Sequence, residues 1–236
     1  ADGTFTGLAA GTYPITITDE NGCEIIIDLI IPEPDLLEIT ATDIVNVSCF
    51  GGSDGSITVI GAGGVVDYEF SIDGGPFDPS GIFDGLGAGT YTIEILDFVG
   101  CSESTTIDIT EPPALTLDLV TSTDALCFGG DDGTLQVVAA GGTGAFEYAI
   151  DGGPFGAADT FTGLEAGTHT VTVRDDNDCE TDLDVVIGES DAIVVDYVVV
   201  AETCLGDCTG SIALDASEGI APYTYSIDGC ATTSLT

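Results

Sequence analysis

The stretch Phe-Asp-Gly-Leu-Gly-Ala-Gly-Thr-Tyr at residues 83–91 occurs in closely related form at residues 5–13 and 161–169. The copies begin at Phe5, Phe83 and Phe161, so the chain has a constant period of 78. A fixed period of this length is typical of one folding unit copied in tandem. The 236-residue chain is therefore an array of about three repeats, and each residue is best interpreted by its position in the repeat.

Apolar and polar residues alternate along the segments around this stretch, for example at 56–60, 90–95 and 105–109. A period of two, with Val, Ile, Thr and Tyr dominant, predicts half-buried β-strands. Tight-turn signals separate these runs, as in Asp-Gly-Gly-Pro at 73–76 and again at 151–154. About seven short strands per repeat predict an all-β fold of tandem immunoglobulin-like antiparallel β-sandwiches that form a rod or filament. An open barrel is the less natural alternative.

The boundaries where one repeat should give way to the next lie at 31–35, 110–113 and 188–191, and the first two of them carry a pair of prolines. Proline restricts its neighbours to extended backbone, so these short joints should be stiff. Only two complete repeats fit between them. We expect the C-terminal half of a repeat, two complete repeats, and an N-terminal half completed by the adjoining unit, at residues 1–33, 34–111, 112–189 and 190–236.

Six of the eight cysteines follow the period, in two series: Cys23, Cys101, Cys179 and Cys49, Cys127, Cys204. One separation in sequence, 52, recurs between the series, and it predicts one disulfide inside each repeat, Cys49–Cys101 and Cys127–Cys179. By the same register, Cys204 should pair with Cys23 of the adjoining unit. Cys208 and Cys230 fall outside the series and are expected to form a local bridge.

Zinc is the competing interpretation of recurring cysteines, but it requires closely spaced cysteine pairs, usually with histidine. The chain has one histidine, and only Cys204 and Cys208 are close in sequence. Disulfides are therefore favoured. They place the protein outside the cytoplasm, at the cell surface.

The order of these motifs resembles the SprB-type repeats of the giant gliding-motility adhesins of Bacteroidota. The motifs that carry the resemblance are C-x-G-x-x-x-G-[ST]-[IL], P-Y-T-Y-S-I-D-G, F-x-G-L-x-A-G-T-Y, D-x-x-G-C and E-P-P, at residues 49–57, 222–229, 5–13, 19–23 and 111–113. The resemblance implies very long surface filaments that bind substrata. It assigns no binding residue, because the motif is a folding motif. His169 in place of Tyr, and the additional Cys208 and Cys230, depart from it.

The chain carries 42 acidic residues against a single basic one, for a formal charge of −41. Such a surface excludes nucleic acids and anionic lipids as partners, since both require clustered Lys and Arg. Carboxylates in turns are also the ligands that Ca²⁺ prefers. No cofactor is required by the sequence; a calcium site is the alternative interpretation, at Asp175, Asp176, Asn177 and Asp178, or in the acidic loops 53–55 and 131–133.

The sequence contains no arrangement of residues typical of a catalytic site. His169 takes the place of Tyr13 and Tyr91 in the repeat, which indicates a packing position rather than a general base. The sequon Asn46-Val47-Ser48 is interpreted as incidental, and no apolar segment is long enough for membrane insertion. We therefore expect a protein that is not an enzyme.

The sequence favours a structural and adhesive role, as the shaft of an extracellular filament. The expected partners are copies of itself placed end to end, or further repeats of the same chain. One alternative is a carbohydrate-binding sandwich array, although the chain has no Trp and few tyrosines on which sugars could stack. The other alternative is a calcium-stiffened surface-layer component.

Overall fold

The computed structural model describes residues 3–204 and 209–227. In these residues the regular elements are the strands β1 to β16, and none is a helix. The described part of the chain accordingly holds no helix that could span a membrane. The chain divides into two compact units, Ala1–Glu111 and Pro112–Thr236, which are described separately below.

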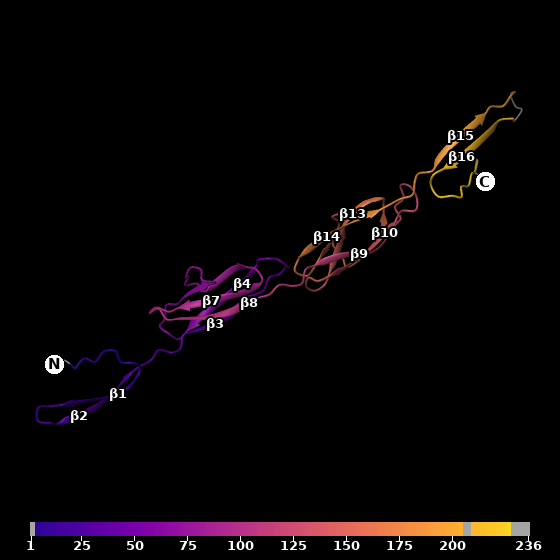
Figure 1. Cartoon of the computed structure of the whole chain (residues 1–236). Coiled ribbons are helices and arrows are strands. Elements are labelled where there is room, and N and C mark those ends of the chain that lie inside the picture. The colour runs from indigo at the N-terminus through magenta and orange to yellow at the C-terminus, as the bar shows by residue number, and fades with distance from the viewer. Residues whose placement is uncertain (1–2, 205–208, 228–236) are drawn as a thin grey trace. The chain divides into compact units, whose positions relative to one another are not determined.

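The first complete repeat is a sandwich of two three-stranded antiparallel sheets (Figure 1). One sheet has the order β3-β4-β6 and the other β5-β7-β8. The bounds are β3 Glu38–Val45, β4 Gly55–Ala62, β5 Glu69–Ile72, β6 Ile82–Leu86, β7 Gly89–Leu96 and β8 Ser102–Ile109. The expected all-β sandwich is thus confirmed, with six strands in the repeat where about seven were expected.

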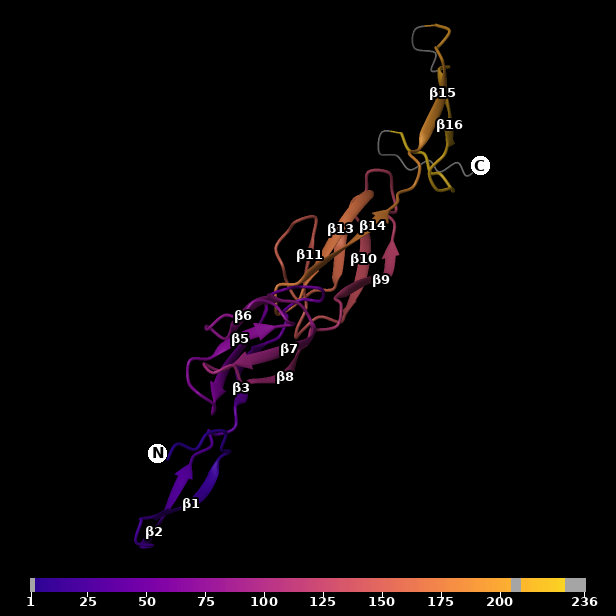
Figure 2. The same ribbon diagram turned by 60° about the vertical axis from the view of Figure 1, so that its left-hand side comes forward.

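The second complete repeat has the same strands one period later (Figure 2). Its sheets have the orders β9-β10-β12 and β11-β13-β14. The bounds are β9 Thr116–Thr123, β10 Gly133–Ala140, β11 Glu147–Ile150, β12 Thr160–Leu164, β13 Gly167–Arg174 and β14 Glu180–Ile187. Identical topology at a constant offset confirms the period as the length of one domain.

Each complete repeat buries its own hydrophobic core between its two sheets. Alternate residues of β4 and β7 point inward, as the period-two pattern requires, and their side chains are at most 2% exposed: Ile57, Val59, Ile93 and Ile95. The equivalent positions in the second repeat are also buried: Leu135, Val137, Val171 and Val173. The core is thus repeated along with the strands.

Two further hairpins flank the complete repeats. Strands β1 (Gly11–Thr18) and β2 (Glu24–Ile31) form one, and β15 (Val194–Val200) and β16 (Ser211–Ser217) form the other. In the repeat, the first hairpin occupies the position of the β7–β8 hairpin, and the second occupies that of the β9–β10 hairpin. Both expose large apolar side chains, such as Ile17 and Tyr197.

Each complete repeat has two ends, which position its loops. At the N-pole, where the chain enters, Gly64 N–H donates to the Asp35 carbonyl (2.8 Å). At the C-pole, where the chain leaves, Val47 N–H donates to the Thr110 carbonyl (3.0 Å). The β3–β4 loop therefore lies at the C-pole, and the β7–β8 turn lies at the N-pole.

Candidate functional site: the loops at the two poles

The N-pole is organised by a buried carboxylate, Asp97, whose residue is 4% exposed. One carboxylate oxygen accepts hydrogen bonds from the N–H groups of Val99 (3.0 Å) and Cys101 (2.8 Å), and the other from that of Val65 (3.0 Å). These donors, Val65 first, hold the pKa of Asp97 below its ordinary value. The carboxylate thus closes the β7–β8 turn and ties it to the β4–β5 loop.

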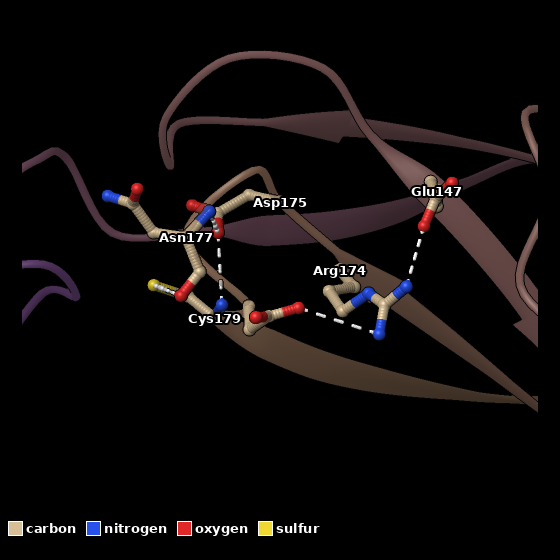
Figure 3. A network of polar contacts seen from close by, with 6 residues as sticks. Glu147, Arg174, Asp175, Asn177 and Cys179 are labelled. Atoms are coloured by element: carbon tan, nitrogen blue, oxygen red, sulfur yellow. Dashed lines mark hydrogen bonds and ion pairs between the residues drawn. The ribbon is translucent and has the colours of Figure 1, made fainter.

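Asp175 does the same in the second complete repeat. It is 4% exposed and accepts from the N–H groups of Thr143 (2.8 Å), Asn177 (2.9 Å) and Cys179 (3.0 Å), in part drawn in Figure 3. At the β1–β2 turn, Asp19 accepts from the N–H of Cys23 (2.8 Å), the main cause of its lowered pKa. The Asp of the D-x-x-G-C motif is therefore a structural residue, which its recurrence in every repeat could by itself have indicated.

These bonds bear on the calcium hypothesis. Asp175 presents both oxygens to backbone N–H donors, and Asp178 lies 3.5 Å from Arg174 Nη1. Among the residues that the structure describes, no group of three or more His, Cys, Asp or Glu side chains could hold a metal ion. Calcium at Asp175, Asp176, Asn177 and Asp178 stays a prediction, one that requires Asp175 to give up these bonds.

The other two acidic loops lie at the C-poles. Asp54 accepts hydrogen bonds from the Ser48 hydroxyl (2.5 Å) and N–H (3.1 Å), and the hydroxyl is the main cause of its lowered pKa. Asp132 accepts from the N–H of Leu126 (2.9 Å) in the equivalent loop. Both carboxylates thus shape the loop that carries a cysteine.

A glutamate fastens each C-pole loop to the end of its repeat. Glu111 Oε2 accepts from Gly51 N–H (2.6 Å), and Glu189 Oε2 accepts from Gly129 N–H (2.6 Å). The two glutamates are one period apart, and Glu111 is the Glu of the E-P-P motif. In the sequence this motif indicates only the boundary of a repeat, whereas the fold shows that its glutamate also bonds the C-pole loop.

The cysteines of one repeat lie at opposite poles. Cys49 is in the C-pole loop, whereas Cys101 is in the N-pole turn, so β8 separates them. Eight residues of strand span about 27 Å, whereas a disulfide requires Cα atoms within about 7 Å. Cys49 is disulfide-bonded, and Cys101 is an exposed free thiol.

The second complete repeat has the same arrangement, with Cys179 disulfide-bonded and Cys127 an exposed free thiol. The expected pairs Cys49–Cys101 and Cys127–Cys179 are therefore not those of this structure. Although the two cysteines of each repeat have the same separation in sequence, their loops lie at opposite poles, so the constant separation does not indicate a bond. Cys23 and Cys204 are exposed free thiols, so their link across adjoining units stays a prediction. The expected pair Cys208–Cys230 lies outside the described residues.

His169 occupies a tyrosine position with tyrosine-like bonding. Its Nε2 lies 2.9 Å from the Glu165 carbonyl, and the Tyr91 hydroxyl donates to the equivalent Gly87 carbonyl (3.0 Å). His169 Nδ1 also lies 2.7 Å from a carboxylate oxygen of Asp151. The Glu165 carbonyl and then Asp151 raise the pKa of His169 above its ordinary value. These contacts fit a packing position.

Arg174, the sole arginine in the sequence, links β13 to the edge strand β11 of the sheet β11-β13-β14. Arg174 Nη2 donates to Glu147 Oε2 (2.7 Å) in the neighbouring strand, as Figure 3 shows, and the guanidinium lies 4.3 Å from the Phe155 ring centroid. Arg174 and Glu147 are both partly exposed, and an ion pair in such a position contributes little to stability. Its role is local.

Comparison with known proteins gives one family match. A family model described as SprB repeat matches residues 41–77, 119–155 and 197–232. The matched segments begin in β3, β9 and β15, at equivalent positions of the repeat. No curated protein matches the chain.

Solved structures show weaker likeness. A C-terminal 282-residue fragment of intimin, solved with the intimin-binding domain of the translocated intimin receptor, is 16% identical with a TM-score of 0.35; the match covers 67% of this chain and 65% of that one. Immunoglobulin domains 1–4 of Sidekick-1 are 12% identical with a TM-score of 0.32, covering 77% and 59%.

Proposed function

Because this chain carries SprB repeats at three positions, we propose that it is a structural and adhesive module of a long extracellular filament. Each repeat would be one segment of the shaft. The observation that carries the proposal is the recurrence of strands, core and pole bonds in the two complete repeats. A domain that recurs together with the hydrogen bonds at its two poles can be repeated many times, so that a chain is lengthened by adding further copies of the domain.

Each complete repeat holds its own end of the connecting segment by a hydrogen bond, which supports its role as a self-contained module. Glu111 is bonded to the Gly51 loop of the first repeat, and the Pro113 carbonyl accepts from Gly142 N–H (2.9 Å) in the second. Only Pro112 lies between these two anchors.

The charge and the disulfide support a place outside the cell. Disulfides persist in oxidising compartments, and Cys49 and Cys179 are disulfide-bonded. The net charge of −41 favours solubility and keeps neighbouring shafts apart at low salt. We extend the proposal to surface adhesins of the gliding-motility type in Bacteroidota, on the strength of the repeat family.

The domain boundaries expected from the sequence are part of the same proposal. The β1–β2 hairpin corresponds to one sheet of a repeat and the β15–β16 hairpin to the other. Their exposed apolar side chains, including Ile25, Ile27, Val195 and Ile212, would be buried if a hairpin of the complementary kind packed on each. We propose that a neighbouring repeat of the same chain or of another copy supplies it.

Electron microscopy of the native material tests the filament. We expect a thin rod whose axial repeat matches the length of one sandwich. Isolated globular particles under the same conditions would contradict the proposal.

A carbohydrate-binding role is supported by one feature of the first complete repeat. A groove of about 780 Å³ near the N-pole is lined by Tyr68 and Phe98, among other residues. Phe98 is 72% exposed, a geometry that a sugar ring could stack on. The equivalent position in the second repeat is Asp176, so the feature is not repeated along the array. Glycan-array binding that is lost in Phe98→Ala would favour this alternative.

A further inference from the structure

We propose that the groove near the N-pole of the first complete repeat binds an oligosaccharide of amino sugars whose amines carry a positive charge. This N-pole groove is the cavity of about 780 Å³ that residues of β4, β5, the β4–β5 loop and the β7–β8 turn line. The inference rests on the carbohydrate-binding alternative proposed above and names the class of sugar that the groove fits. It does not depend on the filament proposal.

The backbone that carries the exposed ring of the groove is fixed by hydrogen bonds. Phe98 follows the buried Asp97, whose carboxylate accepts from Val65 N–H in the β4–β5 loop and from Val99 N–H in the β7–β8 turn (both 3.0 Å). Phe98 N–H in turn donates to the Val65 carbonyl (3.2 Å). The two loops are thus fastened to each other, and the Phe98 ring is 72% exposed on this framework. Little backbone freedom would be lost when a ligand binds to it.

A second aromatic ring lines the same groove. Tyr68 is partly buried, and its hydroxyl donates to the Gly63 carbonyl (2.6 Å). A Cβ added to Gly61 would lie 2.7 Å from Tyr68 Cδ2, so the missing side chain of Gly61 makes room for this ring. Aromatic faces contact the apolar C–H faces of sugars, and they also attract cations. The two rings therefore suit a ligand that has both features.

The charge of the groove distinguishes between classes of sugar. Asp67 and Glu69 line the groove and are exposed. The one basic residue of the sequence, Arg174, belongs to the other complete repeat, so no basic side chain lines the groove. An acidic sugar would be repelled there, whereas an ammonium group is attracted both by the carboxylates and by the aromatic faces. A charged amino sugar combines this group with a ring that can stack.

The apolar residues of the groove depart from the repeat. The position of Phe98 is occupied by Glu20 one period earlier and by Asp176 one period later. Val66, which also lines the groove and is 69% exposed, is replaced by Gly144 in the second complete repeat. A residue that the fold requires should recur in each copy. Exposed apolar side chains that gather in one copy of an acidic array indicate a binding surface instead.

A basic peptide is the other cationic ligand to consider, and an extended peptide binds by adding a strand to an exposed sheet edge. The strand edges beside the groove are already occupied. Phe70 N–H in β5 donates to the Asp78 carbonyl (2.9 Å), and Asp78 N–H donates back to the Phe70 carbonyl (2.8 Å). Val59 N–H in β4 donates to the Gly81 carbonyl (2.8 Å). Recognition therefore rests on the rings and carboxylates, which favours a sugar.

Isothermal titration calorimetry of the full chain tests the inference with a set of matched probes. They are the β-1,4-linked trimer of glucosamine, its neutral N-acetylated form, and end-blocked trilysine, which has as many ammonium groups but no sugar ring. At about pH 6 the sugar amines are charged, as α-amino groups are. Salt at about 150 mM limits the reach of distant acidic residues to about 8 Å. We expect the glucosamine trimer to bind at a single site per chain, about tenfold more tightly than either other probe.

Matched variants connect this binding to the groove. Phe98→Ala should weaken binding of the glucosamine trimer about tenfold. Phe50→Ala removes another exposed phenylalanine, at the opposite pole of the same repeat, and should leave the binding unchanged. Asp67→Asn should weaken it about threefold, whereas Asp43→Asn, which removes the same charge from an exposed position in β3, should not. Far-UV circular dichroism shows that each variant is folded.

Four other outcomes overturn the inference. Equal binding of the N-acetylated trimer that is lost in Phe98→Ala would identify a neutral-sugar site, and the carbohydrate-binding alternative would then stand without the inference. Equal binding of trilysine that is lost in Phe98→Ala would identify a peptide site. Many trimers per chain, with no effect of Phe98→Ala, would show cations gathered on an acidic surface. If no probe binds, the inference fails, and the glycan array still decides whether the chain binds any other sugar.

Discussion

Replacing Ile93 with alanine tests whether each complete repeat is stabilised by its own core. Ile93 is fully buried between the sheets of the first complete repeat. The change removes three carbon atoms, at about 0.8 kcal/mol each for transfer from water, or about 2.4 kcal/mol. The cavity left behind adds to this, so we expect the free energy of unfolding of that repeat to fall by about 3–4 kcal/mol.

Urea denaturation of the full chain, followed by far-UV circular dichroism, measures the change. Ile15, the same repeat position in the β1–β2 hairpin, is only half-buried. Ile15→Ala is therefore the matched control, with an expected loss below about 1 kcal/mol. Val171→Ala should shift the transition of the other complete repeat instead. A loss below about 1 kcal/mol for Ile93→Ala, or losses that are equal for Ile93→Ala and Ile15→Ala, would refute the reasoning.

Three further changes probe the poles. Gly63 has φ +73°, and a Cβ added there would lie 1.8 Å from the Leu36 carbonyl oxygen. Gly74 has a similar φ of +70°, but a Cβ added there meets no atom within 4 Å, so Gly74→Ala carries only the backbone cost of about 1 kcal/mol. Gly63→Ala should therefore be far more destabilising than Gly74→Ala, and equal melting temperatures for the two variants would contradict this. The pKa of His169 is raised in the folded state, so its contribution to stability is complete below the ordinary pKa of 6.5 and is lost as pH rises through the folded-state pKa. His169→Tyr should therefore reduce the pH dependence of the melting temperature between about pH 6 and about 8. An unchanged pH profile would count against the contact with Asp151. The pKa of Asp97 is lowered in the folded state, so its contribution to stability is present above about pH 4 and is lost as pH falls through the folded-state pKa. Asp97→Asn should lower the melting temperature at pH 7 and weaken the fall of the melting temperature in acid. Thermal scans from pH 7 down to about 2 can check both effects.

The sequence determined the repeat and its fold class. The recurrence of one stretch at a fixed period defined the domain length, and alternation of apolar residues identified strands such as 90–95 as half-buried. Both are local or periodic properties, which can be identified from the sequence without the tertiary structure. The equivalence of His169 with Tyr13 and Tyr91 was readable for the same reason, and bonding to the carbonyl four residues earlier bears it out in all three.

The tertiary structure alone decided where the loops lie. Whether two hairpin loops share a pole depends on how many times the chain crosses the sandwich between them, and a separation in sequence does not reveal that number. Cys49 and Cys101 were for this reason paired wrongly. The structural role of Asp175, named in the sequence only as a candidate calcium ligand, is also visible only in the folded turn, where three N–H groups converge on its carboxylate. A backbone donor has no sequence identity, so its partner becomes visible only when the chain is folded.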